Sequence, residues 1–211
     1  MADLADALAN LDEDEVRKLV REKIDAGAEP MSIVDECRKG MDIVGERYKS
    51  KDYFLSELII SGEMFKEAMA VVEPLLKGGR EADPLSKMVL GTVKGDIHNI
   101  GKDIVATLLT AAGFEVYDLG IDVQPSALVE KLIETGAPIL GMSGLLTPSF
   151  ESMKETVKAV EAAGLRDKVR IIIGGGIVTE KVGEYVGADA FTNDGTEGVD
   201  ICKRFVKGGK K

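Results

Sequence analysis

The chain has little of what nucleic-acid-binding and membrane proteins need. Its 211 residues include 27 lysines and arginines against 37 aspartates and glutamates, which gives a net charge of −10. A protein that binds duplex DNA presents a basic face to the phosphates, and this sequence has no basic excess. No uninterrupted apolar run approaches the roughly 20 residues that a helix needs to span a bilayer. We therefore expect neither a nucleic-acid partner nor a membrane anchor.

Cysteine is scarce as well. Cys37 and Cys202 are the two cysteines, and they lie far apart without a C-x-x-C pattern. The sequence therefore predicts neither a disulfide framework nor a zinc site. The first residues, "MADLADALANLDEDE", are acidic and lack the basic and apolar segments of a secretory signal peptide. We expect a cytoplasmic protein.

Histidine occurs only once in the sequence, at His98. It lies in "VKGDIHNIGKDIV", residues 93–105, two places after Asp96. A metal-ligating imidazole usually donates its second N–H to a carboxylate, a role that Asp96 fits, with Ser149 behind it. One histidine cannot build a zinc site, so a metal at His98 would have to arrive with most of its coordination filled, as in a macrocycle. A solvated surface histidine is the alternative at this point.

The first 76 residues repeat their apolar side chains with a helical period. Asp12 followed by Glu15 forms a variant capping box, and Gly27 and Pro30 separate two helices. With a short opening helix, residues 1–76 are predicted to form a four-helix bundle. Residues 77–86, "KGGREADPLS", are predicted to be a linker whose glycines permit a hinge motion.

The rhythm changes after this linker, and residues 87–211 are predicted to form a second domain. Short apolar runs alternate there with longer amphipathic stretches. The runs are residues 88–93, 115–120, 138–143, 169–175 and 188–191, and helices are predicted to start near Gly101, Pro125, Ser149, Val178 and Gly195. This alternation predicts an α/β fold, with a five-stranded parallel sheet and helices on both faces. An open, flavodoxin-like strand order is the simplest arrangement.

Small and polar residues follow several predicted strands at one edge of this sheet. In an open parallel sheet, ligands bind beyond the carboxyl ends of the strands. The residues at this edge are Gly95, Asp96, His98 and Gly101, then Ser143, Thr147 and Ser149, then Gly174, Gly175 and Gly176, and last "FTNDGT". Together they predict a deep polar slot for a long ligand. Taken singly, the glycines suit a tight turn, and Ser143 and Thr147 suit helix caps. The first strand-to-helix turn lacks G-x-G-x-x-G, which argues against nicotinamide binding.

The order and spacing of these residues resemble a known signature. The cobalamin-binding pattern D-x-H-x-x-G, S-x-L and G-G is matched in order by Asp96, His98 and Gly101, by Ser143 and Leu145, and by Gly174 and Gly175. The resemblance covers nearly the whole chain, because residues 1–76 are similar to the helical cap that precedes the corrinoid module of cobalamin-dependent methionine synthase. A cap followed by a Rossmann-type cobalamin-binding domain resembles the corrinoid proteins of three-component methyltransferase systems.

The resemblance implies a role for each matched residue. His98 would be the lower axial ligand of cobalt, in place of the cofactor's own benzimidazole, with Asp96 and Ser149 as a hydrogen-bonded relay behind it. The cofactor, cobalamin or a related corrinoid such as methylcobalamin, would bind base-off and histidine-on. Residues implied to contact it are Gly95, Asp96, Ile97, His98, Asn99, Gly101, Ser143, Leu145, Thr147, Gly174, Gly175, Gly176 and Gly195. In the cap, Tyr48, Phe54 and Leu55 match the segment that covers the upper face, with ordinary helix packing as the alternative.

The implied function is that of a methyl carrier that is not catalytic alone. It would accept a methyl group on cobalt(I) from a substrate-specific methyltransferase and pass it to an acceptor methyltransferase, which would use an acceptor such as coenzyme M or tetrahydrofolate. A reductive activation protein would be a third partner. The alternative is the adenosylcobalamin-binding subunit of a radical mutase, which shares D-x-H-x-x-G but ordinarily lacks the helical cap. A cobalamin-sensing regulator would need a basic DNA-binding domain, for which no residues remain.

Overall fold

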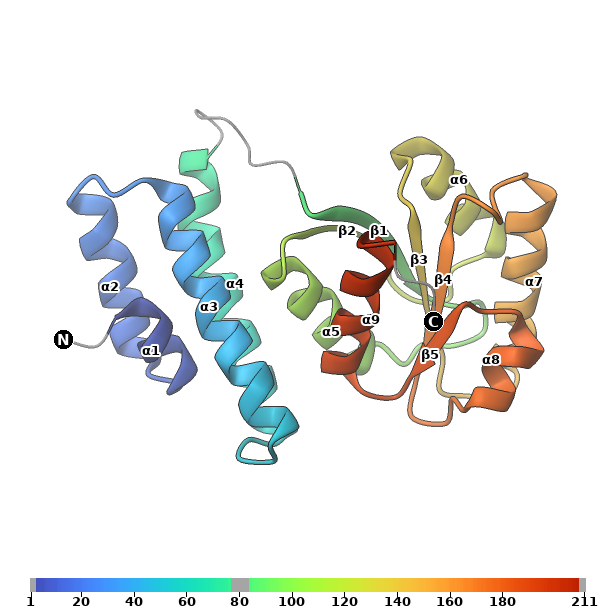
Figure 1. Cartoon of the computed structure of the whole chain (residues 1–211), viewed down its shortest axis with the longest axis horizontal. Helices are drawn as coiled ribbons and strands as arrows, with labels where there is room; N and C mark the ends of the chain where they lie inside the picture. The colour runs from blue at the N-terminus through green and yellow to red at the C-terminus, as the bar shows by residue number, and fades with distance from the viewer. Residues whose placement is uncertain (1–2, 77–83, 209–211) are drawn as a thin grey trace. The chain divides into compact units, whose positions relative to one another are not determined.

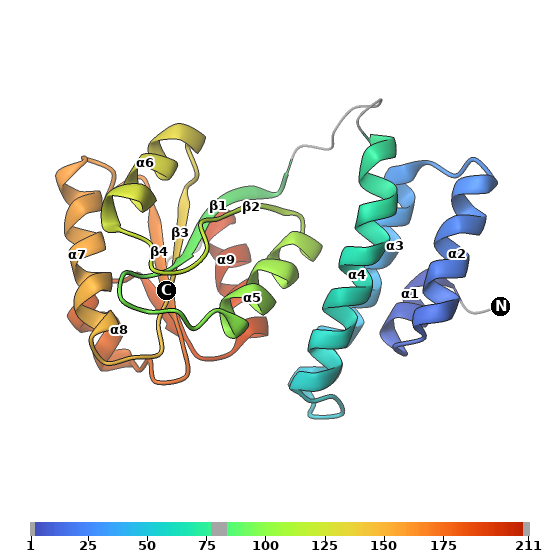
Figure 2. The same ribbon diagram turned by 180° about the vertical axis from the view of Figure 1, so that it is seen from behind.

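The computed structural model describes residues 3–76 and 84–208. The chain divides into two compact units, Met1–Asp83 and Pro84–Lys211, and Figures 1 and 2 show the elements of each unit from opposite sides. Most of the predicted linker, residues 77–83, lies outside the described residues, and Ser86 at its end already belongs to the first strand. Within the described ranges, no helix is both long enough and apolar enough to cross a membrane.

The described part of the first unit is a bundle of helices. These are α1 Leu4–Ala9, α2 Glu13–Asp25, α3 Pro30–Lys49 and α4 Leu55–Leu76. Asp12 caps α2, because its carboxylate accepts the backbone N–H of Glu15 at 3.1 Å. Pro30 takes the first position of α3, where its missing N–H leaves no bond unmade. The predicted four-helix bundle is confirmed.

A close contact between α1 and α3 organises the core of this bundle. A Cβ atom on Gly40 would lie 2.9 Å from the carbonyl oxygen of Ala5 and 3.0 Å from the Cβ atom of Leu8, so the approach requires glycine. The larger side chains buried around it are Leu4, Leu8, Val16, Val20, Ile33, Val34, Cys37, Met41, Val44, Leu58, Phe65 and Val72. The helical unit thus has a hydrophobic core of its own.

The second unit is an α/β fold in which all five paired strands are parallel. The strands are β1 Ser86–Thr92, β2 Phe114–Asp118, β3 Ile139–Ser143, β4 Arg170–Gly174 and β5 Ala190–Thr192. The helices are α5 Ile100–Ala111, α6 Pro125–Thr135, α7 Ser149–Ala162, α8 Glu180–Val186 and α9 Gly195–Val206. The strand order β2-β1-β3-β4-β5 is flavodoxin-like, and the predicted fold is confirmed. One helix, α8, begins later than near Val178, because the N–H of Val178 closes a turn onto the carbonyl of Gly175 at 3.0 Å.

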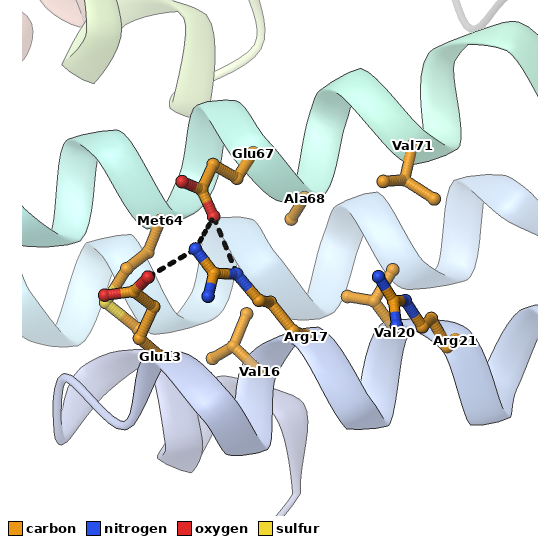
Figure 3. Close-up of a pocket in the computed structure, with 9 residues that line it drawn as sticks. All are labelled: Glu13, Val16, Arg17, Val20, Arg21, Met64, Glu67, Ala68 and Val71. Atoms are coloured by element: carbon orange, nitrogen blue, oxygen red, sulfur yellow. Dashed lines mark hydrogen bonds and ion pairs between the residues drawn. The ribbon is translucent and has the colours of Figure 1, made fainter.

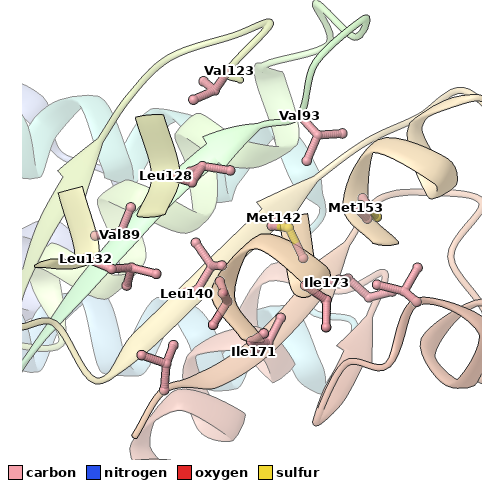
Figure 4. Close-up of a cluster of buried hydrophobic side chains, with 14 of the residues drawn as sticks. Val89, Val93, Val123, Leu128, Leu132, Leu140, Met142, Met153, Ile171 and Ile173 are labelled. Atoms are coloured by element: carbon pink, nitrogen blue, oxygen red, sulfur yellow. The ribbon is translucent and has the colours of Figure 1, made fainter. Parts of the chain in front are cut away.

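The helices of this unit form two layers, one on each face of the sheet. Helices α5 and α9 pack together on one face, and α6, α7 and α8 cover the other (Figures 1 and 2). Figure 4 shows the hydrophobic core beneath α6–α8. The strands contribute to it Val89, Leu140, Met142, Ile171 and Ile173, and the helices contribute Leu128, Leu132, Met153, Val157 and Val160. This second core fixes the positions of the strand ends.

The carboxyl ends of four strands are level with one another. Thr92 of β1 pairs with Ser143 of β3, Ser143 pairs with Gly174 of β4, and Gly174 pairs with Thr192 of β5. The loops after these strands therefore leave the sheet from one row. The fold brings segments that are far apart in sequence to a single edge, as expected for a ligand site in an open parallel sheet.

Candidate functional site

Residues 93–99, called the histidine loop here, follow β1 and carry the predicted signature. Gly95 has a φ of +81°, and the N–H of Asp96 then donates to the carbonyl of Val93 at 3.1 Å. The hydroxyl of Thr92 donates to the carbonyl of His98 at 3.1 Å. The loop is therefore folded back on itself, and His98 stays beside the end of the sheet.

Asp96 is the buried centre of the site, with 0% of its surface exposed. Its Oδ1 accepts the backbone N–H of His98 at 2.9 Å and lies 2.7 Å from His98 Nδ1. Its Oδ2 accepts the backbone N–H groups of Leu145 and Leu146, at 2.7 Å and 3.1 Å, and the hydroxyl of Ser149 at 2.7 Å. Burial alone would favour the neutral acid, but the hydrogen bonds, that of Ser149 first, hold the pKa of Asp96 well below its usual range. The carboxylate is therefore ionised at neutral pH.

His98 is the exposed end of this relay. Its side chain is 47% exposed, whereas the carboxylate behind it is fully buried. With the proton on Nδ1, the ring donates to Asp96 and keeps a lone pair on Nε2, across the ring. A carboxylate that fixes the tautomer in this way is the usual partner of a metal-ligating histidine. The geometry favours ligation over the alternative of a solvated surface histidine.

Close contacts between glycines bring the loop after β3 to Asp96. A Cβ atom on Gly175 would lie 2.0 Å from the carbonyl oxygen of Gly144, and the φ of Gly175 is +145°. A Cβ atom on Gly144 would lie 2.7 Å from the Cβ atom of Ser149. Side chains at either glycine would push this loop away. The relay therefore depends on backbone approaches that other residues would prevent.

A groove of about 660 Å³, counting the space open to solvent, lies between the sheet and helices α5 and α9. Its apolar lining comes from Met88, Leu90, Gly141, Ile172 and Cys202, and its polar lining from Ser143, Thr192, Asn193 and Asp194 at the strand ends. A Cβ atom on Gly141 would lie 2.2 Å from Cε of Met88, so the glycine leaves room for the Met88 side chain on this face. Burial raises the pKa of the Cys202 thiol to about 12, which keeps it neutral. The groove suits a long ligand with an apolar end.

The predicted contact residues fall in two places. Those that line the groove are Gly101, Ser143, Gly174, Gly175, Gly176 and Gly195. Those in the relay or in the histidine loop are Gly95, Asp96, Ile97, His98, Asn99 and Ser149. Leu145 reaches the relay through its backbone N–H. Thr147 is exposed in the turn before α7 and belongs to neither group.

Exposed apolar side chains flank the relay. Ile97 and Ile100 lie on either side of His98 in sequence and are 67% and 69% exposed. Leu145 and Leu146, whose N–H groups bind Asp96, are 38% and 41% exposed. Large apolar side chains that gather around an exposed polar group indicate a ligand surface. Here they would contact something broad and partly apolar.

The predicted cap residues lie in the helical unit. Phe54 precedes α4 and is 68% exposed, and Leu55 begins α4 and is 49% exposed. The N–H of Phe54 donates to Oε2 of Glu57 at 2.8 Å, which fixes the start of the helix. Tyr48, near the end of α3, is partly buried. Packing within the bundle does not account for the exposed Phe54 and Leu55, whereas it does for much of Tyr48.

A second groove, of about 480 Å³ with its open space, lies between α2 and α4 of the helical unit (Figure 3). Arg17 crosses it and pairs with Glu13 and, at 2.9 Å, with Glu67. These side chains are about half exposed, so the ion pairs contribute little to stability. None of the residues predicted for the site lines this groove.

The structure adds site residues that sequence reasoning missed. Gly144 lies between the matched Ser143 and Leu145, so its place in the motif was the available signal. Lys102 lines the main groove and is 3% exposed, with its ammonium 2.6 Å from Oδ1 of Asp103 and in contact with Asp118. Its position beside the signature glycine gave no hint of burial. Two carboxylates balance its charge, so it ties α5 to the end of β2.

The donor set fits a metal that brings its own ligands. In residues 3–76 and 84–208, no group of three or more His, Cys, Asp or Glu side chains could hold a metal ion. The site instead offers one imidazole, exposed apolar side chains beside it and a long groove. A bare zinc ion would need three or four protein ligands. A metal in a macrocycle with a long substituent fits these residues.

Comparison with known families defines the class of protein. A family model described as a B12 binding domain matches residues 86–202, and another of the same description matches residues 1–73. The first match covers more than half of the chain, and the two together include both units. These matches and the site define a B12-binding protein.

Known relatives make the assignment more specific. A corrinoid protein of Desulfitobacterium hafniense is 35% identical over 97% of this chain and 96% of its own. The dimethylamine corrinoid protein of Methanosarcina barkeri is 34% identical over 98% and 97%. The chain therefore belongs to the B12-binding family of corrinoid proteins, as the resemblance of its motifs predicted.

One solved structure agrees with this assignment, and a second shows the same fold. A cobalamin-binding protein from Desulfitobacterium hafniense is 41% identical, with a TM-score of 0.76 over 96% of both chains. The methanol:cobalamin methyltransferase complex of Methanosarcina barkeri contains a chain of the same fold. That chain is 24% identical, with a TM-score of 0.86 over 99% of this chain and 80% of its own.

Proposed function

We propose that the chain carries methyl groups on a corrinoid ligated by His98, and that it works between two methyltransferases without being an enzyme by itself. Membership of the corrinoid family supports the cofactor. The relationship to the dimethylamine corrinoid protein of Methanosarcina barkeri supports the methyl-transfer role. The match of the helical unit to a B12 binding domain favours this role over the mutase subunit, which ordinarily lacks such a cap.

The observation that carries the proposal is the relay of Ser149, Asp96 and His98. The fully buried carboxylate of Asp96 accepts hydrogen bonds from backbone and side-chain donors and is therefore fixed in one position. What it holds is the only imidazole of the chain, with Nε2 free to act as a ligand. A structural histidine would need no exposed ring and no apolar surround.

Each residue of the relay would have a defined task. When bound, a corrinoid supplies a cobalt centre that takes up a methyl group and gives it to an acceptor. His98 would hold the metal through Nε2. Asp96 would keep the proton on Nδ1 and, being ionised, would make the imidazole a stronger donor. Ser149 and the backbone N–H groups of Leu145 and Leu146 would keep Asp96 ionised and in place.

The groove between the sheet and helices α5 and α9 would hold the nucleotide tail that His98 displaces. Its polar strand-end residues, Ser143 and Thr192 among them, suit the sugar and phosphate. Its apolar lining suits the aromatic base. The lining glycines, Gly174, Gly175 and Gly176, leave the backbone open to close approach. This division of the site supports base-off binding.

The cap and the partners complete the proposal. Phe54 and Leu55, exposed in the helical unit, would cover the methyl-bearing face together with Tyr48. A substrate-specific methyltransferase would load the methyl group, and an acceptor methyltransferase would remove it. A reductive activation protein would restore the carrier after oxidation. The donor would be set by the loading partner.

A visible spectrum of the full chain reconstituted with methylcobalamin tests the proposal. We expect a base-off, histidine-on spectrum for the wild type, and loss of its nitrogen-ligand features in His98→Ala. Lys94→Ala is the matched control, because Lys94 is an exposed residue of the same loop outside the relay. An unchanged spectrum in His98→Ala, or no binding by the wild type, would contradict the proposal.

A further inference from the structure

Asp122 lies outside the signature and the relay, yet it contacts the histidine loop twice. Its Oδ1 accepts the backbone N–H of Gly95 at 2.7 Å. Its own backbone N–H donates to the carbonyl of Asp96 at 3.0 Å. Gly95 and Asp96 are consecutive, so a single residue from another loop holds the backbone at this point of the histidine loop, whereas the relay holds the side chain of Asp96.

The loop that carries Asp122 is itself fastened to β1. Residues 119–123 follow β2, and the N–H of Thr92 donates to the carbonyl of Gly120 at 2.9 Å. The N–H of Val123 donates back to the carbonyl of Thr92 at 3.0 Å, and Val123 forms a parallel bridge with Val93. Both valines are buried. This loop therefore continues the sheet past the end of β1 and gives Asp122 a firm base.

The backbone of Asp122 adopts a conformation that few side chains favour. Its φ is +52°, in the left-handed region, where aspartate and asparagine are tolerated better than most residues. Such a conformation persists where the surroundings determine it. The hydrogen bonds of Gly120 and Val123 on either side do so here, and the carboxylate of Asp122 thereby meets the N–H of Gly95.

We propose that Asp122 is a positioning residue for the axial ligand. It holds the first half of the histidine loop so that the Asp96–His98 pair presents Nε2 in one place. The relay fixes the carboxylate of Asp96, and Asp122 fixes the backbone on which that carboxylate stands. This inference rests on the proposed role of His98 as a metal ligand.

The contact is suited to positioning more than to stability. Asp122 and Gly95 are both exposed, and a single exposed hydrogen bond contributes little to the free energy of folding. The buried core on either side of the sheet does not include them. Loss of the hydrogen bond between Asp122 and Gly95 should therefore change which conformations the histidine loop populates, while the unit stays folded.

Three substitutions at one position separate the side chain from the backbone. Asp122→Ala removes the acceptor and keeps a side chain at the positive φ. Asp122→Gly also removes the acceptor but relieves the backbone. Asp122→Asn keeps an oxygen that can accept the N–H of Gly95 and tolerates the same φ. Asp167→Ala, at an exposed aspartate in the turn before β4, is the matched control at the opposite edge of the sheet.

The first readout is the pH at which the reconstituted chain loses its histidine-on spectrum. Protons compete with the metal for Nε2, so weaker ligation moves the midpoint to higher pH. We expect a rise of about half to one pH unit in Asp122→Ala and Asp122→Gly, which is a roughly three- to tenfold weaker ligation, the scale of one hydrogen bond. Asp122→Asn and Asp167→Ala should keep the wild-type midpoint.

The second readout needs no cofactor. Hydrogen exchange at the Gly95 amide of the free protein should be faster in Asp122→Ala and Asp122→Gly and unchanged in Asp122→Asn. A wild-type midpoint in Asp122→Ala would overturn the inference, as would restoration by Asp122→Gly, since the backbone alone would then be responsible. A wild type without any histidine-on spectrum would instead overturn the proposed function, and the exchange at Gly95 would distinguish the two failures.

Discussion

The two faces of the sheet are built from alternate residues of the same strands and serve different ends. Leu140 and Met142 of β3 are buried in the packed core beneath α6–α8. Gly141, between them, lies on the other face, against Met88 and Leu90 of the groove lining. Because side chains alternate along a strand, one strand can build a core and a ligand groove at once.

The two faces carry different side chains and serve stability and binding differently. On the packed face the strands carry large side chains, and Leu140, Ile171 and Ile173 are 0% exposed. On the groove face β3 carries Gly141 between larger side chains of β1 and β4, and the helices stand away from part of the sheet. The apolar lining of the groove is buried as well, since Met88, Leu90 and Ile172 are between 1% and 6% exposed, so the two faces differ in the space that the glycine leaves and not in the burial of their side chains.

Leu140→Ala should have the largest effect, and the effect should be on stability. Truncating this fully buried side chain leaves a cavity, and such changes cost about 2–5 kcal/mol. Urea unfolding followed by circular dichroism should show the loss, while the folded protein should bind methylcobalamin with an unchanged Kd. An equally large loss of affinity would contradict the division of roles between the two faces, because the packed face would then also shape the groove.

Gly141→Val, at the next residue, should act mainly on binding. The added Cβ would lie 2.2 Å from Cε of Met88 and 2.8 Å from Cδ1 of Leu90, so both side chains would have to move within the groove. We expect roughly 10- to 100-fold weaker binding of methylcobalamin by calorimetry, or about 1.4–2.8 kcal/mol. Cobinamide, which lacks the nucleotide tail, is the control ligand and should bind as before. Equal losses for both ligands would show that the groove does not hold the tail.

Asp96→Asn, beyond the carboxyl ends of the strands, should have an effect on stability that depends on pH. The native contacts lower the pKa of Asp96. Its contribution to stability is therefore present above the unfolded carboxyl pKa, about 3.9, and is lost as pH falls below it. The substitution should reduce stability by about 1–3 kcal/mol at neutral pH, because buried donors lose their acceptor.

Urea unfolding of the free protein from pH 7 to about pH 3 measures this dependence. The curves of the wild type and Asp96→Asn should converge on acidification, and Ser149→Ala, which keeps the backbone donors, should lie between them at neutral pH. Parallel curves would mean that Asp96 is not held ionised by the fold.

Much of the fold was predictable because local sequence patterns indicate its helices and strands. Apolar runs marked all five strands, and Pro125, Ser149 and Gly195 begin helices as predicted. The start of α8 was less clear, since Val178 is apolar and belongs to a turn that depends on the positive φ of Gly175. A backbone angle of this kind leaves no periodic trace in the sequence.

Some contacts of the site could likewise be predicted from the sequence, and others could not. The pairing of Asp96 and His98 followed from their spacing, with Ser149 expected behind Asp96, and the family resemblance implied the same relay. The N–H groups of Leu145 and Leu146 and the contacts of Asp122 could not be predicted, because they depend on how loops from different strands meet. Backbone donors also carry no residue type that a pattern can record.

The scarcity of histidine allows the axial ligand to be identified directly. His98 is the only one in the chain, so labelling with ¹⁵N-histidine marks a single imidazole. The protein would be reconstituted, reduced to the cobalt(II) form and studied by electron paramagnetic resonance. Ligation by His98 predicts superhyperfine splitting from one nitrogen, whose pattern changes when ¹⁴N is replaced by ¹⁵N. A spectrum that is the same with both isotopes would contradict it, because the axial nitrogen would then not belong to His98.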